Sequence, residues 1–415
     1  MIIRARLAIP TPGTVVEDAV VRIDGVRIAE VSRYSEFRAS GGKVDRDLGD
    51  VLLLPGLINA HCHLDYTMLR GALLGTHSFT RWVQRLNAVR SCLTLEEITE
   101  SVEQGFQQLA RFGITTVLNI ESYPEVLNHI LAPPIRTFWF YELIDIRRKN
   151  PSEEMVSGAL RFFEQNPGWL GGCGLSPHAP YTATQEMYAL AAEAAAGTGM
   201  GLSTHLGESS EERQMFEERT GPLHEFMKEL GRNNLDCGPG KPSPLRRLAE
   251  NGVLGPHWIV AHLNEIAPQD WALLEPGGLL HGMTVVHCPQ SHEFFGHKRF
   301  SMERLLACGA NVCLGTDSLA SGRELSLFRE MALAHGYFPK LSPDHLLEMV
   351  TLAPAKALGM AGLIGIIRPG AYADLTAVRY SGPKNKASEA VLTPFRHAAF
   401  TMCHGQIVFE SQSED

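Results

Sequence analysis

The sequence predicts an α/β protein with a (β/α)8 TIM barrel and a small β-sandwich domain formed by both chain ends. Short apolar runs alternate with helical stretches through the middle of the chain, and strand-like segments flank this alternation on both sides. We therefore expect residues 1–54 and 366–415 to form the β-sandwich domain and residues 55–365 to form the barrel. A chain of 415 residues can hold a barrel of about 250 residues and a smaller domain.

Both chain ends contain segments that favour short strands. Segments 20–23 and 26–29 flank Asp24-Gly25, a dipeptide typical of a two-residue hairpin turn because such a turn needs positive φ. Near the C-terminus, segments 374–378 and 399–403 have the same character. We expect the two ends to pair with each other.

Between the ends, eight apolar runs have the length of buried strands. They are 51–54 leading into 57–60, 114–120, 135–143, 174–176, 201–204, 258–261, 284–286 and 311–314. One connecting helix is well marked, because Thr94 and Glu97 form a capping box and Gly113 stands where a helix usually stops. Eight strands that alternate with helices favour a parallel barrel, since parallel strands need long crossover connections.

Composition excludes several classes of function. The formal net charge is −9 and no basic run stands out, so we expect no nucleic-acid partner. No stretch approaches the roughly 20 apolar residues of a membrane span, and Arg4 and Arg6 interrupt any secretion signal, so we expect a cytoplasmic protein without a membrane partner. The eight cysteines are far apart and are expected to be mostly buried thiols.

Polar side chains follow nearly every predicted strand. In a barrel of this type the loops after the strands converge at one rim, where the chemistry is carried out. The residues found there are His61 and His63, Asn119 and Glu121, Glu142, His178, His205 with Glu208, His262, His287 and Asp317.

The pair His61 and His63 suits a metal clamp. At positions i and i+2 of an extended segment both rings leave the same face, while Cys62 points the other way. Taken alone the pair is weak evidence, because about one such pair is expected by chance among 17 histidines in 415 residues. A strand-end pair with solvent contacts explains it equally well.

Three further strand endings strengthen the metal interpretation. His205, His262 and Asp317 each follow a different apolar strand, whereas a single His in such a place is usually a hydrogen-bonded structural group. Several buried polar groups together would be costly unless they had partners. Imidazole and carboxylate ligands with an open position suit Zn²⁺, and Fe²⁺ is an alternative.

These motifs resemble the amidohydrolase superfamily. The similar segments are Pro-Gly-Leu-Ile-Asn-Ala-His61-Cys-His63, Ser-Pro-His178-Ala-Pro-Tyr-Thr, His205-Leu-Gly-Glu208, Ala-His262 and Gly-Thr-Asp317-Ser. The resemblance spans nearly the whole chain. The nearest branch contains s-triazine hydrolases and the deaminases of methylthioadenosine, S-adenosylhomocysteine and aminodeoxyfutalosine.

The resemblance implies one metal ion per chain. Two-metal members usually bridge their ions with a carboxylated Lys after strand four, but segment 175–178 contains no Lys. The implied ligands of a single Zn²⁺ are His61, His63, His205 and Asp317, with His262 close by. The alternative is a second ion bridged by Glu142.

The same resemblance suggests catalytic roles. Glu208 would give a proton to a ring nitrogen and later collect one from the attacking water. Asp317 would also hold the water's proton, and His262 would steady the developing oxyanion. The alternative for Glu208 is an exposed carboxylate favoured by a helix dipole.

The implied substrate is a small heterocycle, most simply a 6-aminopurine nucleoside. His178 is expected to face it, and Tyr66, Arg70 and Trp82 would line the mouth of the site. The stretch Ser-Asn-Leu-Lys-Leu of the methylthioadenosine and S-adenosylhomocysteine deaminases is absent after strand seven.

In its place stands segment 288–297, with His292 and His297, which resembles more closely the aminodeoxyfutalosine deaminases of menaquinone biosynthesis. Arg147 and its neighbour would meet the carboxylate of that ligand, or else be solvated surface charges. The alternative functions are deamination of adenosine, methylthioadenosine or S-adenosylhomocysteine, chloride or amine loss from an s-triazine, and a non-catalytic scaffold. The sequence also leaves open that the protein forms a homo-oligomer.

Overall fold

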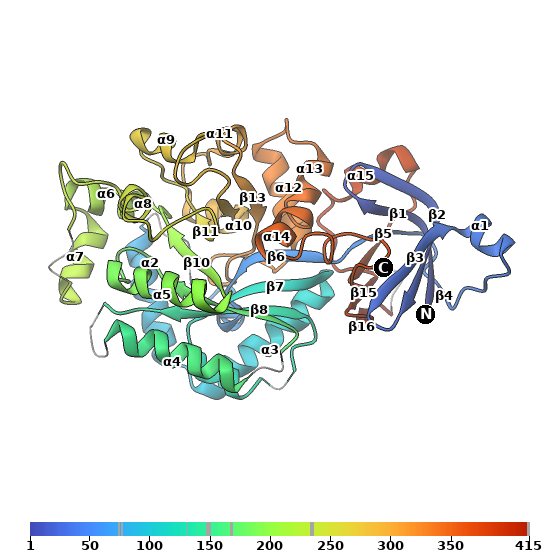
Figure 1. The fold of residues 1–415 in the computed structure, drawn as a ribbon, viewed down its shortest axis with the longest axis horizontal. Coiled ribbons are helices and arrows are strands. Elements are labelled where there is room, and N and C mark those ends of the chain that lie inside the picture. Colours follow the sequence, from blue (N-terminus) through green and yellow to red (C-terminus); the bar gives the residue numbers. More distant parts are fainter. Residues whose placement is uncertain are drawn as a thin grey trace.

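The computed structural model describes residues 1–412 apart from 74, 76, 77, 131, 147–150, 167, 168 and 233–235. It contains a parallel eight-stranded sheet that curls into a nearly closed barrel and a separate mixed sheet built from both chain ends. The predicted fold class is thereby confirmed. Figure 1 shows the barrel with its surrounding helices beside the sheet that carries the N- and C-terminal segments.

The barrel strands are neighbours in the order of the sequence, and every pair of them is parallel. They are β6 (Leu57–Cys62), β7 (Ile114–Glu121), β8 (Arg136–Leu143), β9 (Gly171–Pro177), β10 (Gly201–Leu206), β11 (Trp258–His262), β12 (Thr284–His287) and β13 (Asn311–Leu314). The first and last strands meet at the rim, where the Asp317 backbone N–H donates to the His61 carbonyl at 3.1 Å. The barrel therefore closes at two of the predicted ligands.

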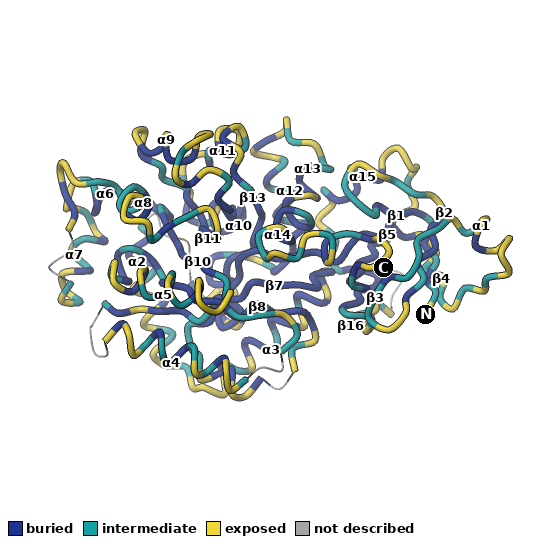
Figure 2. Tube along the Cα trace, in the orientation of Figure 1, coloured by how far each residue is buried: buried dark blue, intermediate teal, exposed yellow. Residues whose placement is uncertain are grey.

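The outside of the barrel is covered by helices. They are α2 (Phe79–Arg90), α3 (Leu95–Arg111), α4 (Ser152–Gln165), α5 (Gln185–Thr198), α6 (Ser210–Glu218), α7 (Pro222–Glu229), α8 (Pro244–Glu250), α9 (Trp271–Leu274), α10 (Pro289–Phe295), α11 (Met302–Ala307), α12 (Leu327–Tyr337), α13 (Pro343–Glu348) and α14 (Leu352–Ala357), with short 3-10 turns η1 (Leu64–Leu69), η2 (Pro124–Asn128) and η3 (Pro268–Asp270). Figure 2 shows the strands buried and the outer faces of the helices exposed. Covered on the outside by helices and packed inside the barrel, most barrel-strand residues are buried, polar ones included.

The helix predicted from its caps is α3. Thr94 accepts from the Glu97 backbone N–H at 3.2 Å, and the Glu97 carboxylate accepts from the Thr94 backbone N–H at 2.8 Å. The helix ends at Arg111, and Gly113 follows with φ of +79°. The capping box and the glycine stop are both as predicted.

The second sheet joins the two ends of the chain. Its order is β16-β15-β14-β5-β1-β2-β3, with β4 beside β1. The strands are β1 (Ile2–Thr11), β2 (Thr14–Asp24), β3 (Arg27–Arg33), β4 (Arg46–Asp47), β5 (Val51–Pro55), β14 (Leu375–Arg379), β15 (Phe400–Cys403) and β16 (Gln406–Glu410), accompanied by α1 (Tyr34–Ala39), η4 (Lys384–Lys386) and α15 (Ala387–Ala390).

Two details of the prediction for these ends need correction. The run 51–54 is not the start of the first barrel strand, because β5 pairs with β1 and β14 and the barrel begins only at β6. The hairpin turn is shifted by one residue: Asp24 pairs with Arg27, which leaves Gly25 and Val26 at the turn, and Gly25 alone supplies the positive φ of +57°. The domain boundaries at 54/55 and 365/366 stay predictions.

Two further expectations concern membranes and thiols. Among the described residues, no helix is both long enough and apolar enough to cross a bilayer. All eight cysteines are free thiols, and only Cys92 is exposed. Burial of most of these thiols is as predicted.

Candidate metal centre and cavity

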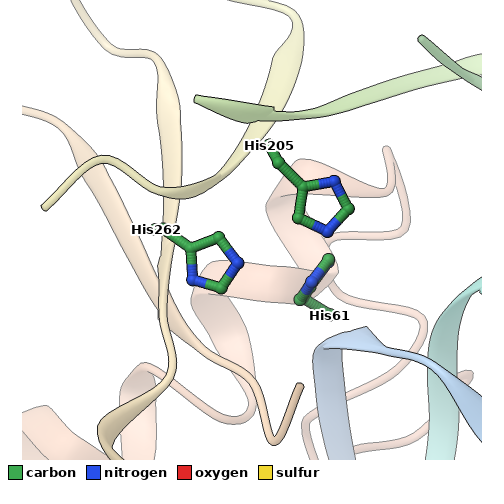
Figure 3. A group of neighbouring side chains, drawn as sticks. All are labelled: His61, His205 and His262. Carbon is green, nitrogen blue, oxygen red and sulfur yellow. The ribbon is translucent and has the colours of Figure 1, made fainter. Parts of the chain in front are cut away.

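Five polar side chains from four strands and their following turns converge at one end of the barrel. His61 lies on β6 and His63 directly precedes η1, while His205 lies on β10, His262 ends β11 and Asp317 follows β13. All five are buried. Figure 3 shows the rings of His61, His205 and His262 pointing toward one another.

The distances among these groups suit a common cation. His63 Nε2 and His205 Nε2 lie 3.1 Å apart, and Asp317 Oδ1 lies 3.7 Å from His61 Nε2 and 3.9 Å from His63 Nε2. Two overlapping sets have all their ligand atoms within 4.8 Å of one another: His61, His63 and Asp317, and His61, His205 and His262. The structure thus brings together residues separated by more than 250 positions in the sequence.

The backbone is strained where two of these residues are placed. His262 and Asp317 have φ of +71° and +54°, values that residues other than glycine rarely adopt. Each such residue costs on the order of 1–3 kcal/mol. Hydrogen bonds hold the strained turns, since Leu263 N–H donates to the Leu206 carbonyl at 2.9 Å and Asp317 N–H donates to the His61 carbonyl. The strain turns both side chains toward the barrel axis.

Hydrogen bonds at the back of the site fix which atoms face it. His205 Nδ1 is 3.1 Å from the His178 carbonyl, which can only accept, so Nδ1 carries the proton and Nε2 keeps its lone pair. Ser321 Oγ donates to Asp317 Oδ2 at 3.0 Å, which leaves Oδ1 facing the imidazoles. Both contacts orient a metal ligand.

Electrostatics keep the imidazoles neutral. Burial, assisted by neighbouring imidazoles, lowers the pKa of His61, His63 and His262 well below the usual value, and burial lowers the pKa of His205 to about 4. Neutral imidazoles are the form that binds metal ions. His61 Nε2 and His262 Nε2 are also buried without a hydrogen-bond partner among the described residues. A cation of the Zn²⁺ class fits this donor set, because it would satisfy these atoms.

Glu208 lies beside this cluster, with Oε1 3.7 Å from His262 Nε2. Burial first, and then the charges of Asp317 and Glu212, raise the pKa of Glu208 well above its usual value, which favours the protonated form of its carboxyl group. The Glu212 carboxylate fixes the turn by accepting the backbone N–H groups of Gly207 at 3.2 Å and Glu208 at 2.8 Å. Glu208 is therefore a positioned acid and not an exposed helix-start carboxylate.

The cluster opens into a cavity of about 720 Å³. His63, His205, Glu208, His262 and Asp317 line its inner end. Farther out, apolar side chains of α2, α4, α7 and neighbouring loops dominate the wall. They include Phe79, Trp82, Leu86, Ile146, Met155, Phe226, Met227 and Leu230.

The predicted substrate-contact residues fall into two groups. Tyr66, Trp82 and His178 line the cavity. Tyr66 also stacks on His63, with ring centroids 5.5 Å apart, and burial lowers the pKa of His178 to about 3. Trp82 Nε1 donates to the Ala320 carbonyl at 3.3 Å.

The other predicted contacts do not line the described cavity. Arg70 is exposed and donates to Gln108 on α3, outside the barrel. His292 Nδ1 lies 3.1 Å from Asn264 Oδ1, and His297 packs against His292, with ring centroids 5.3 Å apart. Their contact with substrate stays a prediction. Arg147 lies outside the described residues.

Several cavity residues were missed by sequence reasoning, among them Arg90, and Glu142 was underrated. Arg90 lines the cavity although no role was predicted for it. Its signal was the spacing Trp82, Leu86, Arg90, which places all three on one face of a helix. Glu142 was considered only as a bridge between two metal ions, yet it lines the cavity and forms a third possible ligand group with His178 and His205.

Comparisons with known proteins agree with this geometry. The model of the family described as the amidohydrolase family matches residues 52–408. A 5-methylthioadenosine/S-adenosylhomocysteine deaminase of Pyrococcus furiosus is 30% identical over 384 residues, which cover 89% of this chain and 84% of that protein. An aminodeoxyfutalosine deaminase of Deinococcus radiodurans is 27% identical over 364 residues, covering 84% and 82%. The structure of an adenosine deaminase from Xanthomonas campestris with bound zinc is similar at a TM-score of 0.81 and 22% identity, covering 99% and 92%.

Proposed function

Because the chain belongs to the amidohydrolase family, and so is a hydrolase of carbon–nitrogen bonds other than peptide bonds, we propose that it is a zinc-dependent aminohydrolase that replaces the exocyclic amine of a 6-aminopurine nucleoside. Aminodeoxyfutalosine is the leading substrate. Its support is the segment around His292 and His297 together with the similarity to the aminodeoxyfutalosine deaminase of Deinococcus radiodurans.

The metal ligands in this proposal are His61, His63, His205 and Asp317, which would hold one Zn²⁺, with Fe²⁺ as the alternative ion. The zinc bound to the similar adenosine deaminase structure supports this choice. When bound, such an ion lowers the pKa of a water molecule to about 7 and so supplies the nucleophile. His262 lies close enough to the same cluster to hydrogen-bond the oxygen that becomes negative during the reaction.

Glu208 supplies the proton that activates the substrate. Burial raises its pKa and so favours the protonated form, from which it would give a proton to a ring nitrogen of the purine and make the neighbouring amidine carbon electrophilic. The resulting carboxylate then collects a proton from the attacking water, and Asp317 can accept the other. Asp317 would then pass its proton to the exocyclic amine, which leaves as ammonia, so both protons of the water are accounted for.

The observation that carries the proposal is the arrangement at the inner end of the cavity. Neutral imidazoles, the Asp317 carboxylate and the buried Glu208 face a cavity with an apolar outer wall, which is large enough for a nucleoside. Neither a scaffold protein nor a simple binding protein needs a buried acid with a raised pKa beside a metal-ligand set.

The test is ammonia release by the zinc-loaded enzyme. The panel contains aminodeoxyfutalosine, adenosine, 5′-deoxyadenosine, methylthioadenosine, S-adenosylhomocysteine and an s-triazine. We expect turnover of the nucleosides and the highest kcat/KM for aminodeoxyfutalosine. If only the s-triazine is turned over, the proposed substrate class must change from purine nucleosides to triazines. If no compound in the panel is turned over, the proposal is rejected.

Methylthioadenosine and S-adenosylhomocysteine are the second candidate substrates. They are favoured by the relative from Pyrococcus furiosus, which has 30% identity and similar length. The panel distinguishes these substrates from aminodeoxyfutalosine by the ratio of their kcat/KM values.

A further inference from the structure

The turn that carries Glu208 lies against a second turn, which follows β11. The backbone N–H of Leu263 in the second turn donates to the Leu206 carbonyl at 2.9 Å. The N–H of Glu265 donates to the Gly207 carbonyl at 2.8 Å. The two turns approach each other closely, because a Cβ atom at Gly207 would lie only 2.8 Å from the Glu265 carbonyl oxygen. A glycine at position 207 therefore lets the two backbones meet.

Asn264 makes a third contact between these turns, and it uses its side chain. Its Nδ2–H donates to the Glu208 carbonyl at 2.9 Å. Since a carbonyl oxygen can only accept, the amide nitrogen must face Glu208 and the amide oxygen must face away from it. That oxygen, Oδ1, lies 3.1 Å from Nδ1 of the buried His292, which therefore donates to it. His292 on α10 thus holds the Asn264 amide in the orientation that the Glu208 carbonyl requires.

Together with Glu212, Asn264 fixes the backbone of Glu208 on both sides of its Cα atom. The peptide group before Glu208 is held by its N–H, which donates to the Glu212 carboxylate at 2.8 Å. The peptide group after Glu208 is held by its carbonyl, which accepts from Asn264. Because peptide groups are planar, holding both of them sets the direction of the Cα–Cβ bond. The place of the Glu208 carboxyl group then depends on its own side-chain torsions alone.

The turn that contains Asn264 also places His262 at the metal site. His262 precedes Asn264 by two residues, and the chain bends between them, where His262 and Leu263 have φ of +71° and +49°. His262 Nε2 lies 3.7 Å from Glu208 Oε1. Two backbone bonds already join the turns, so the bond from Asn264 adds a constraint at the one residue whose carboxyl group faces the cluster.

We propose that Asn264 is a positioning residue for the reaction, which fixes the Glu208 carboxyl group relative to the metal site by holding the Glu208 carbonyl. His292 supports this role by orienting the Asn264 amide. The inference rests on the proposed deaminase function and adds two residues to its machinery. Neither Asn264 nor His292 touches a reacting atom in this scheme, and both act through Glu208.

The first experiment measures steady-state kinetics of the zinc-loaded Asn264→Ala variant with the best nucleoside of the panel. We expect kcat to fall about 10- to 100-fold, because a misplacement of about 1 Å can cost about 100-fold in rate. KM and zinc content should stay as in the wild type. Asn251→Ala, at an exposed position at the end of α8, is the control and should leave kcat unchanged. A wild-type kcat in folded Asn264→Ala would overturn the proposal.

A double-mutant cycle separates positioning from a general loss of structure. In the Glu208→Gln background Asn264→Ala should change kcat less than about twofold, because the group that it positions no longer gives a proton. Equal losses in both backgrounds would show that Asn264 acts independently of Glu208 and would overturn the proposal.

His292→Phe tests the second residue, because it keeps an aromatic ring but removes the donor to Asn264. It should lower kcat about three- to tenfold, the range for one lost hydrogen bond, and have no further effect in the Asn264→Ala background. A higher KM with unchanged kcat would instead assign His292 to substrate contact and overturn its supporting role.

Amide hydrogen exchange keeps this result separate from the proposed reaction, since it needs no turnover. In Asn264→Ala the N–H groups of Gly207 and Glu208 should exchange about fivefold faster, because one hydrogen bond contributes about that factor to local stability. Faster exchange in a protein whose wild type releases no ammonia rejects the deaminase and retains the positioning contact. Unchanged exchange and unchanged kcat in a wild-type background that deaminates nucleosides reject the role of Asn264 and retain the deaminase.

Discussion

The two ends of the cavity are built differently. The inner end is made of residues on barrel strands or directly after them, among them His61, His205 and Asp317, and backbone hydrogen bonds between strands fix their positions. The outer end is made of helices and loops, with Trp82 and Arg90 on α2 and Phe226 on α7. Figure 1 shows α2 and α7 on the same side of the barrel, away from the sheet of the chain ends.

This difference separates chemistry from recognition. At the inner end, a displaced strand would break the barrel sheet itself, so each ligand atom can be held within about 0.5 Å of its productive position. At the outer end, side chains on α2 and α7 can change without breaking that sheet. Substitutions at the inner end should therefore lower kcat, and those at the outer end should change KM.

The largest expected effect is loss of a metal ligand. His61→Ala should lower kcat at least about 10⁴-fold and abolish stoichiometric zinc binding, because the ion supplies the nucleophile. Metal analysis and ammonia release measure the two effects. His257→Ala, at an exposed position before β11, is the control and should behave as the wild type. Full zinc binding by His61→Ala would show that the inner end is not a metal site.

Glu208→Gln is expected to come next. The variant should keep zinc but lower kcat about 10²- to 10⁴-fold, because the amide cannot give up a proton to the ring nitrogen. The pH profile of the wild type should agree, with kcat falling on the alkaline side as Glu208 loses its proton, since its pKa is raised by burial. Undiminished turnover of Glu208→Gln would remove Glu208 from the reaction.

A smaller effect is expected at Glu212, which holds the turn that carries Glu208. Burial raises the pKa of Glu212 from its usual 4.5 to about 7. The folded protein keeps this proton up to about pH 7 while the unfolded chain releases it near 4.5, so the free energy of unfolding falls as pH rises through this window, by at most about 1.4 kcal/mol per pH unit.

Glu212→Gln removes this titration and should give a shallower slope of unfolding free energy against pH. Denaturant unfolding at several pH values measures the slope. Glu218→Gln on the exposed face of the same helix should leave it unchanged. Identical slopes in Glu212→Gln and the wild type would show that the titration of Glu212 does not contribute to the pH dependence of the unfolding free energy.

The smallest effect is expected at Trp82 in the outer end. Trp82→Phe keeps most of the apolar surface but loses the hydrogen bond to the Ala320 carbonyl, so KM should rise about twofold to tenfold while kcat changes little. Steady-state kinetics decide this, and Trp271→Phe on α9, away from the cavity, is the control. A large fall in kcat with unchanged KM would contradict the separation of the two ends.

Much of the fold was readable because its signals are local. The capping box at Thr94 and the stop at Gly113 each depend on residues a few positions apart, and both were predicted correctly. The run at 51–55 was misassigned because an apolar strand looks the same in either sheet; only its pairing with β1 and β14 distinguishes them. Arg70 was expected at the mouth because its segment follows the first barrel strand, whereas its guanidinium donates to Gln108 on α3.

By itself, the sequence determined the parallel barrel, the inventory of imidazoles and carboxylates at the strand ends, and the likeness to a hydrolase family. Tertiary structure alone decided which of these groups share a centre, that Glu208 is buried in a way that raises its pKa, and that Arg90 lines the cavity. The reason is that residue type and spacing along the chain act locally, whereas burial and distance between strands depend on how the barrel closes.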